Sequence, residues 1–246
     1  MHEKGGPNEK DVTISTDVFA FILLAVCAPS RRQPSASGTS GAQESSGTAG
    51  TDGEHSSGSA TLVSGSNGRY LVLFASRSGN TGRVADEIRR QLDCDMLEVV
   101  PSVAYASDYH DMLDQARGEL EAIRKGTYPS VGTTVKRFDD YEIVFVGYPI
   151  WFGSMATPMQ AFLHLHQSGL AGKRIALFAT SGSSGMSVSV GEARRLCPES
   201  EVLDQTLVLT SSALSQTENR VGAWLRAVGA ERQVPAHAVR NGNHRK

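Results

Sequence analysis

Residues 70–81 read YLVLFASRSGNT, and this stretch decides the fold. Its first half, residues 70–75, is a continuous apolar run, as expected of a strand that is buried on both faces of a parallel sheet. Its second half, residues 76–81, is a short loop rich in hydroxyl groups that contains one glycine. A helix is predicted over residues 80–92, because apolar side chains recur there every four positions. The stretch therefore predicts a strand, a loop and a helix in immediate succession.

The same alternation continues to about residue 230. Further strands are predicted over residues 95–100, 142–148, 174–180 and 202–209, and further helices over residues 108–125, 155–166, 188–196 and 216–228. Ser215 is the expected N-cap of the last helix. Strands that alternate with helices imply a parallel sheet with right-handed crossovers and helices on both faces. The prediction is a doubly wound α/β domain with five parallel strands, over residues 69–230, which binds ligands at the carboxyl ends of its strands.

Composition and charge exclude several function classes. The chain has 246 residues and a net charge of -2, so no basic field points to nucleic acid as a partner. Its three cysteines stand in no CxxC motif, so neither a disulfide framework nor a zinc site is expected, and Cys94 and Cys197 are predicted to be small buried residues. His110, His164 and His166 have no second cluster of metal-ligating residues beside them, so we predict surface or groove histidines and no metal.

The first 68 residues differ in composition from the rest. Residues 18–26 (VFAFILLAV) are too few to span a bilayer but have the length of the apolar region of a signal peptide. Cys27 follows them directly. Residues 1–27 together are the predicted leader. Residues 28–68 are rich in Ser, Gly, Thr and Ala, with too few large apolar groups to offset their ordering entropy, so they are predicted to be a disordered linker. Residues 231–246 are expected to form a flexible basic tail.

An apolar run, a cysteine and a Ser/Gly-rich tether, in this order, resemble a bacterial lipoprotein leader, with residues 24–27 at the lipobox position. Two features depart from that pattern. Val26 is larger than the residue that usually precedes a lipidated cysteine, and residues 1–17 contain more acidic than basic side chains, although the start of a signal peptide is normally positive. The resemblance implies a lipoprotein held outside the cell membrane through Cys27. A cytoplasmic protein with an N-terminal extension is the alternative.

The loop at residues 76–81 has the chemistry of an anion site. Hydroxyl groups and backbone amides meet there at the start of a helix, where partial positive charge favours an anion, and Gly79 lets the backbone approach a ligand closely. No lysine follows the glycine, so the loop is not a P-loop, and GxGxxG is absent. An ordinary capped helix would use the same residue types.

This loop resembles the phosphate loop of the flavodoxins, Thr/Ser-x-Thr/Ser-Gly-Asn-Thr, which wraps the 5′-phosphate of FMN. Residues 147–153 (GYPIWFG) are similar to the Gly-Tyr-Pro-Ile-Trp-Trp/Phe-Gly loop of one flavodoxin-like family, whose members often have a lipoprotein leader. The resemblance extends over most of residues 69–230. It implies a flavodoxin-like sheet with strand order 2-1-3-4-5, FMN as the cofactor, and a phosphate cradle formed by Ser76, Arg77, Ser78, Gly79, Asn80 and Thr81.

Two further loops would complete a flavin site. An isoalloxazine ring needs an apolar wall, which an aromatic side chain supplies. The resemblance places the ring against Trp151, with Phe152 beside it, in a loop that consists of Pro149, Ile150, Trp151, Phe152 and Gly153. A core position that caps the sheet is the alternative for Trp151.

The third loop borders the ring by the same resemblance, and its contacting residues would be Thr180, Ser181, Gly182, Ser183 and Gly185. It contains no aromatic residue where flavodoxins commonly have a tyrosine, so the second face of the ring is open or covered differently. Taken alone, the loop also fits a flexible Gly/Ser connection.

The resemblance implies an FMN-binding electron-transfer protein, tethered to a membrane, whose redox partner is a protein or a quinone. Two alternatives stay open. Residues 149–153, the helix predicted after them and Gly172-Lys173 before the fourth strand also resemble FMN-dependent NAD(P)H:quinone oxidoreductases. A flavin-free binding module could also keep the same scaffold. No catalytic side chain is predicted.

Overall fold

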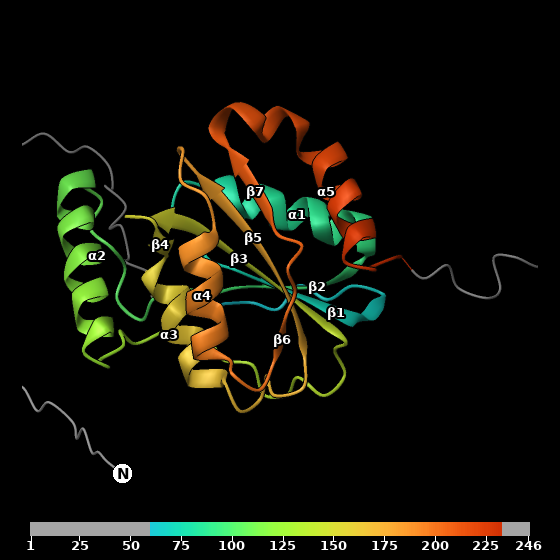
Figure 1. Ribbon diagram of the computed structural model, residues 1–246, viewed down its shortest axis with the longest axis horizontal. Coiled ribbons are helices and arrows are strands. Elements are labelled where there is room, and N and C mark those ends of the chain that lie inside the picture. Colours follow the sequence, from blue (N-terminus) through green and yellow to red (C-terminus); the bar gives the residue numbers. More distant parts are fainter. Residues whose placement is uncertain (1–59, 233–246) are drawn as a thin grey trace, which may run out of the picture. The chain divides into compact units, whose positions relative to one another are not determined.

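The computed structural model describes residues 60–232 (Figure 1). The predicted leader, most of the predicted linker and residues 233–246 of the predicted tail lie outside the described residues. Within this part of the chain, no helix combines the length and the apolar character needed to cross a bilayer.

A parallel sheet forms the centre of the domain (Figure 1). Its strands are β1 (Asn67–Phe74), β2 (Cys94–Glu98), β3 (Ile143–Trp151), β5 (Arg174–Ser181), β6 (Glu201–Val202) and β7 (Leu207–Thr210). They lie in the order β2-β1-β3-β5-β6, with β7 also paired to β5, and the short β4 (Ser154–Met155) adds to β3 in the antiparallel sense. The predicted fourth strand is β5, and the predicted fifth strand is β6 and β7 together, which pair with the same side of β5. The predicted five-strand order 2-1-3-4-5 is therefore confirmed.

The fifth strand is split where one continuous strand was predicted. Arg174 of β5 pairs with Glu201 of β6, whereas Phe178 pairs with Leu207 of β7, so the outer strand gains two residues relative to β5. The interruption lets the backbone carbonyl of Gln205 turn toward α5 and accept a hydrogen bond from the indole of Trp224 at 2.9 Å.

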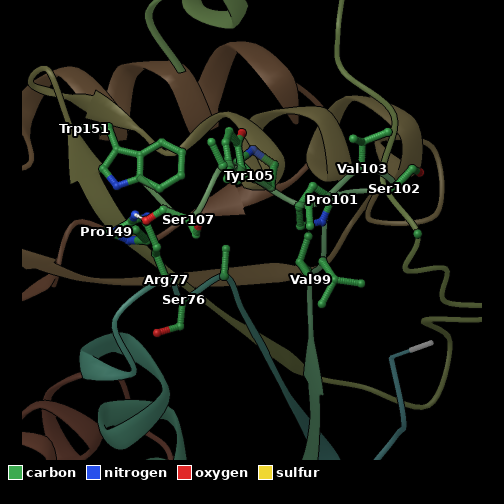
Figure 2. Close-up of a pocket in the computed structure, with 16 residues that line it drawn as sticks. Ser76, Arg77, Val99, Pro101, Ser102, Val103, Tyr105, Ser107, Pro149 and Trp151 are labelled. Carbon is green, nitrogen blue, oxygen red and sulfur yellow. Dashed lines mark hydrogen bonds between the residues drawn. The ribbon is translucent and has the colours of Figure 1, made fainter. Parts of the chain in front are cut away.

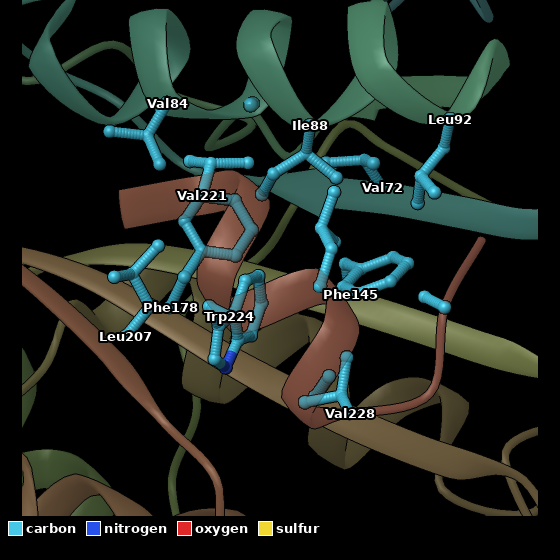
Figure 3. Packing of buried hydrophobic residues seen from close by; sticks show 14 of the residues in the cluster. Val72, Val84, Ile88, Leu92, Phe145, Phe178, Leu207, Val221, Trp224 and Val228 are labelled. Carbon is cyan, nitrogen blue, oxygen red and sulfur yellow. The ribbon is translucent and has the colours of Figure 1, made fainter. Parts of the chain in front are cut away.

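Two hydrophobic cores cover the two faces of the sheet, because successive side chains of each strand point to opposite sides. One core contains Tyr70, Val72 and Phe74 of β1, and the other contains Leu71 and Leu73. The helices α1 (Asn80–Leu92) and α5 (Thr217–Ala227) cover the first face, and Figure 3 shows their apolar side chains meeting over the strands. The second face is covered by α3 (Thr157–His166) and α4 (Ser187–Leu196). The remaining helix, α2 (Tyr109–Arg124), packs on α3 further out (Figure 1).

The domain begins before residue 69, the predicted boundary. Val63 forms an antiparallel bridge with Met96 of β2, with N–H to O distances of 2.8 and 2.9 Å. The amide of Gly65 donates to Asp95 at 2.9 Å, and a Cβ atom at Gly65 would lie only 2.3 Å from the backbone oxygen of Asp93. Residues 60–68 were expected to belong to a disordered linker. Instead, Asn67 and Gly68 are the first residues of β1, and Val63 lies along the free edge of β2, where its backbone supplies two hydrogen bonds that an edge strand otherwise leaves unmade.

The start of the last helix also differs from the prediction. A 3-10 turn, η1 (Ser211–Gln216), contains Ser215, and α5 begins only at Thr217 with Gln216 at its N-cap position and no side-chain cap. Ser215 is therefore not the N-cap. The Thr217 hydroxyl donates back to the carbonyl of Leu214 at 2.7 Å, which joins the turn to the helix.

The two cysteines of the domain behave as predicted. Cys94 and Cys197 are free and buried in the cores. Burial raises the pKa of both thiols to about 12, so they are protonated and inert at neutral pH.

Candidate functional site

A cavity of about 1020 Å³ opens at the carboxyl ends of β1, β2 and β3 (Figure 2). Its volume is at the upper end of the range, roughly 300–1,000 Å³, of small-molecule sites. The walls come from the end of β1, the β2–α2 connection and the end of β3, and the lining residues are Ala75, Ser76, Arg77, residues 99–107, Gly132, Pro149, Trp151 and Pro158. The cavity lies beside the point where the sheet order reverses between β1 and β3, which is the usual ligand position in doubly wound folds.

The loop at residues 76–81 meets one end of this cavity. Gly79 occupies the N-cap position of α1 with φ 80°, a left-handed conformation that glycine adopts without strain, and no side chain caps the helix. The backbone N–H groups of residues 77–81 donate no hydrogen bond to any described residue. Only the next amide, that of Gly82, has a partner, the Ser76 hydroxyl at 3.3 Å. A row of unpaired amides at the positive end of a helix fits an anion such as a phosphate.

The hydroxyl groups of the loop are not equivalent. Thr81 is buried, and its hydroxyl lies 2.8 Å from that of Thr180 at the end of β5. This contact joins the first predicted loop to the third. Ser78 is exposed, Asn80 is half-buried, and neither side chain hydrogen-bonds to another described residue. Ser78 and Asn80 are thus free to bind a ligand, whereas Thr81 braces the loop.

The second predicted loop is mostly strand. Ile150 and Trp151 pair with Met155 and Ser154 of β4, so only Phe152 and Gly153 form the turn. Both have positive φ, 51° and 80°, which is the requirement of a two-residue type I′ hairpin. The prediction of a loop over residues 149–153 was wrong at Pro149, Ile150 and Trp151, because Pro149 still pairs with Thr180 and the chain then folds back on itself, which extends β3 to Trp151.

Trp151 forms a wall of the cavity, whereas Phe152 does not line it. The Trp151 side chain is half-buried and packs on one side against the core that contains Tyr148 and Met155. Its ring meets the Tyr105 ring edge-on, with 5.2 Å between the centroids. Phe152 points outward with an exposed fraction of 45%, and the Arg117 guanidinium lies 4.8 Å from its ring centroid. Trp151 thus has one side on the core and one on the cavity, and the alternative of a core position that caps the sheet stays open.

The third predicted loop reaches the same edge of the sheet but does not line the cavity. Thr180 pairs in register with Pro149 of β3, and both Thr180 and Ser181 are buried in β5. The exposed residues that follow are Gly182, Ser183, Ser184 and Gly185. The structure thus brings the three loops to one edge, and only Ser76, Arg77, Pro149 and Trp151 of the predicted residues contribute to the cavity surface.

Sequence reasoning missed the β2–α2 connection, which supplies much of the cavity wall. Its position could have been inferred, because in a sheet of order 2-1-3 the end of the second strand lies beside the end of the first. Tyr105 is its aromatic residue. The phenol hydrogen-bonds the carboxylate of Glu119 and lies 2.7 Å from the Thr157 hydroxyl. Burial and the hydrogen bond to Glu119 raise the pKa of Tyr105, so the hydroxyl is protonated.

Arg77 gives this site its charge. It is the one charged side chain among the described residues that line the cavity. Its guanidinium donates to the carbonyl of Ser107 at 3.3 Å and lies 5.6 Å from the Tyr109 ring centroid, so it ties the loop at residues 76–81 to the start of α2. An anion in the cavity would meet a cation and no lining carboxylate.

A model of the family described as flavodoxin matches residues 69–228, well over half of the chain. The chain belongs to the flavodoxin family.

Two solved Bacteroides structures agree with this assignment at the level of the fold. The flavodoxin chain is 23% identical to a proposed flavoprotein from Bacteroides eggerthii, with a TM-score of 0.56 over 66% of this chain and 99% of that one. A proposed flavoprotein from Bacteroides uniformis is also 23% identical, with a TM-score of 0.54 over 63% and 99%. A flavoprotein from Lactobacillus acidophilus in complex with FMN is 22% identical over 60% and 97%, with a TM-score of 0.46. No curated protein sequence matches the chain.

FMN is the cofactor of the flavodoxin family, and the residues at this edge of the sheet fit it. The unpaired amides of residues 77–81 suit a phosphate, and the adjoining apolar cavity, with Trp151 in its wall, suits an aromatic ring. The histidines do not suggest a different cofactor. Within residues 60–232, no group of three or more His, Cys, Asp or Glu side chains could hold a metal ion. His110 and His164 are exposed as predicted, and His166 is half-buried, with its ring against Phe138 and Phe162.

Proposed function

We propose that this flavodoxin binds FMN at the carboxyl end of its sheet and serves as an electron carrier. One observation carries the proposal: a run of unpaired backbone amides at the start of α1 opens beside an apolar cavity. The amides of residues 77–81, with the side chains of Ser78 and Asn80, would hold the phosphate. Pro149 and Trp151 would contact the ring.

The bound flavin supplies the redox chemistry, and the chain supplies binding, orientation and electrostatics. Trp151 and Tyr105 present aromatic surface to the cavity, which excludes water from that side of the ring. Arg77 places a positive charge at the cavity wall, which favours added negative charge on a ligand. Thr81 and Thr180 hold the first and third loops together and thereby fix the phosphate cradle relative to the sheet.

The test is an anaerobic titration of the purified protein with FMN and with riboflavin. We expect FMN fluorescence to be quenched on binding, and FMN to bind more tightly than riboflavin because riboflavin lacks the phosphate. The reduced complex should pass electrons to a one-electron acceptor, while NADH and NADPH should not reduce it directly. Protein that takes up no FMN would overturn the proposal and favour a flavin-free binding module.

A second candidate is an FMN-dependent NAD(P)H:quinone oxidoreductase. The exposed third loop favours it, because residues 182–185 place no aromatic side chain over the site and leave room for a substrate to stack. The volume of the cavity is also ample for a second ring. Rapid flavin reduction by NADPH, followed by quinone turnover, would establish the enzyme and reject the carrier.

We also propose that the protein is a lipoprotein held outside the cell membrane, with a cytoplasmic location as the alternative. The order of an apolar run, Cys27 and a Ser/Gly-rich tether supports this. In the host cell, the full chain should label with a fatty acid and sediment with membranes, and Cys27→Ser should abolish both. Unchanged sedimentation of the serine variant would reject the lipid anchor.

A further inference from the structure

A polar cluster joins α2, α3 and the β2–α2 connection behind the cavity wall. The Tyr105 hydroxyl hydrogen-bonds the carboxylate of Glu119 on α2 and lies 2.7 Å from the Thr157 hydroxyl on α3. The Thr157 hydroxyl donates to the same carboxylate oxygen at 2.5 Å, and the Gln115 side chain donates to the other oxygen at 3.3 Å. One carboxylate is therefore shared by three side chains from different parts of the site.

Tyr105 connects this cluster to the cavity. Its hydroxyl is fixed by Glu119 and Thr157, while its ring lines the cavity and meets the Trp151 ring edge-on at an interplanar angle of 87°. Edge-to-face contacts of this kind depend on the orientation of both rings. A phenol with a bound hydroxyl keeps its ring in one place, so the hydrogen bonds of Tyr105 also fix one neighbour of Trp151.

Glu119 itself does not line the cavity. Its helix, α2, contributes no described side chain to the two core clusters and packs on α3 instead. The first part of the β2–α2 connection is held by hydrogen bonds between residues 100–102 and residues 130–133. Tyr105, in its second part, is held through its hydroxyl by Glu119 of α2 and Thr157 of α3, and the shared carboxylate is a polar contact between these two helices.

We propose that Glu119 is a positioning residue of the flavin site, which holds the Tyr105 ring and, through it, the Trp151 ring in the orientation that forms the aromatic wall. This inference rests on the proposed FMN site. Its rival is a purely structural role, in which Glu119 only fastens α2 to α3. Loss of the carboxylate would then lower stability and leave the Trp151 ring unaffected.

The fold contains a matched control. Tyr141 donates its hydroxyl to Asp95 of β2 at 2.8 Å, so the domain has a second half-buried tyrosine–carboxylate pair. Neither residue lines the cavity, and Asp95 lies near the amino end of β2, away from the site. Burial and the hydrogen bond to the carboxylate raise the pKa of Tyr141 as they do for Tyr105, so the two phenols are chemically alike. Tyr105→Phe and Tyr141→Phe therefore each remove a tyrosine–carboxylate hydrogen bond, and Tyr105→Phe also removes the contact with Thr157.

The experiment uses a Trp224→Phe parent, in which Trp151 is the only tryptophan because the chain has two. Four variants of this parent are compared: Tyr105→Phe, Glu119→Leu, Glu119→Gln and the control Tyr141→Phe. For each, acrylamide quenching of Trp151 fluorescence is measured without flavin, together with FMN affinity and the thermal midpoint.

We expect Tyr105→Phe and Glu119→Leu to increase the quenching constant and to weaken FMN binding about 3- to 10-fold, the effect of one lost hydrogen bond. Glu119→Gln keeps an acceptor oxygen and should restore most of both properties.

Tyr141→Phe should lower the thermal midpoint without changing either readout at the site. Two results would overturn the inference: parental quenching and FMN affinity in Tyr105→Phe and Glu119→Leu, or equal changes in Tyr141→Phe. A parent that fails to bind FMN would reject the proposed function instead. The quenching of Trp151, which needs no flavin, would still decide whether Glu119 positions the ring.

Discussion

At the scale of single residues, two side chains with the same donor group differ in what they can bind when one of them already has a hydrogen-bond partner. Thr81 and Ser78 are both hydroxyl residues of one loop, yet the Thr81 hydroxyl is shared with Thr180 and that of Ser78 is free. A free hydroxyl can add a charge-assisted hydrogen bond to a phosphate, whereas a paired hydroxyl first has to give up its partner.

Ser78→Ala should therefore weaken FMN binding. A hydrogen bond to a charged phosphate contributes about 1.5–3 kcal/mol, so affinity should fall roughly 10- to 100-fold. Riboflavin has no phosphate, and its affinity should change little. Ser168→Ala is the matched control, because Ser168 is an exposed serine that follows α3 and does not line the cavity. Equal losses for FMN and riboflavin would show that the loop does not hold the phosphate.

Trp151→Ala should reduce FMN affinity with a limited loss of stability. The variant removes apolar area and an aromatic contact of about 0.5–1.5 kcal/mol from the cavity wall, so affinity should fall at least about tenfold. Trp151 is only half-buried, so the loss of stability should be below the roughly 3–5 kcal/mol of a buried tryptophan. Trp224→Ala supplies that comparison, since Trp224 is 5% exposed in the other core. Isothermal titration and urea denaturation of both variants would measure this, and unchanged FMN affinity would remove Trp151 from the site.

His166 gives the domain a pH-dependent stability. Its Nε2 accepts a hydrogen bond from the Val135 amide at 3.1 Å, and its ring stacks on Phe162. Burial lowers the pKa of His166 below its ordinary value of about 6.5. A lowered folded-state pKa means that the stabilisation is complete above about pH 6.5 and is lost as the pH falls through the folded-state pKa.

Thermal midpoints measured from pH 7.5 to 5 should therefore decrease, and His166→Gln, which keeps an acceptor but does not titrate in this range, should flatten the curve. His164→Gln, at an exposed histidine two positions earlier, is the control. Parallel curves for the parent and His166→Gln would contradict the prediction.

At the scale of elements, local patterns predicted those parts of the fold that depend on short stretches of chain. The bounds of α1 were predicted to the residue, because the glycine before it and the four-residue apolar period after it are both local signals. The continuation of β3 through Trp151 was not predicted, because Pro149 suggests the end of a strand. The strand continues because Ile150 and Trp151 pair with β4, a contact that depends on the hairpin turn after them. The Thr81–Thr180 contact and the β2–α2 wall depend on strand order, which no single stretch encodes.

The pairing of Val63 with Met96 is another contact that no short stretch of sequence predicts. It implies that a chain shortened at its amino end should be less stable. A chain that begins at Ser66 lacks the two backbone hydrogen bonds of this bridge and the one from Gly65 to Asp95. At about 0.5–1.5 kcal/mol each, their loss should lower the free energy of unfolding by roughly 1.5–4.5 kcal/mol relative to a chain that begins at Ala60. The uncovered edge of β2 should also promote self-association. Urea denaturation and size-exclusion chromatography test both effects, and identical behaviour of the two chains would show that the segment is dispensable.

At the scale of the whole molecule, one sheet carries both cores, since alternate residues of the same strands enter each of them. The described domain should therefore unfold in a single cooperative transition, and a ligand that binds only the folded state should raise the midpoint of that transition. FMN at about 100 times its dissociation constant would add about 2.7 kcal/mol. For a domain of this size, that corresponds to an increase of roughly 5–11 °C in the thermal midpoint.

The same linkage relation predicts how the phosphate loop contributes to this shift. If Ser78→Ala weakens FMN binding about tenfold, the same FMN concentration is only about 10 times the new dissociation constant, and the added stability falls to about 1.4 kcal/mol. The midpoint shift should then be about half that of the parent, while the midpoints of the two flavin-free proteins should agree, because Ser78 is exposed and unpaired within the described residues. Differential scanning calorimetry with FMN, riboflavin and inorganic phosphate separates the contributions. A full FMN shift in Ser78→Ala would place the phosphate elsewhere, and a shift from riboflavin as large as that from FMN would mean that the row of free amides at the start of α1 holds no phosphate.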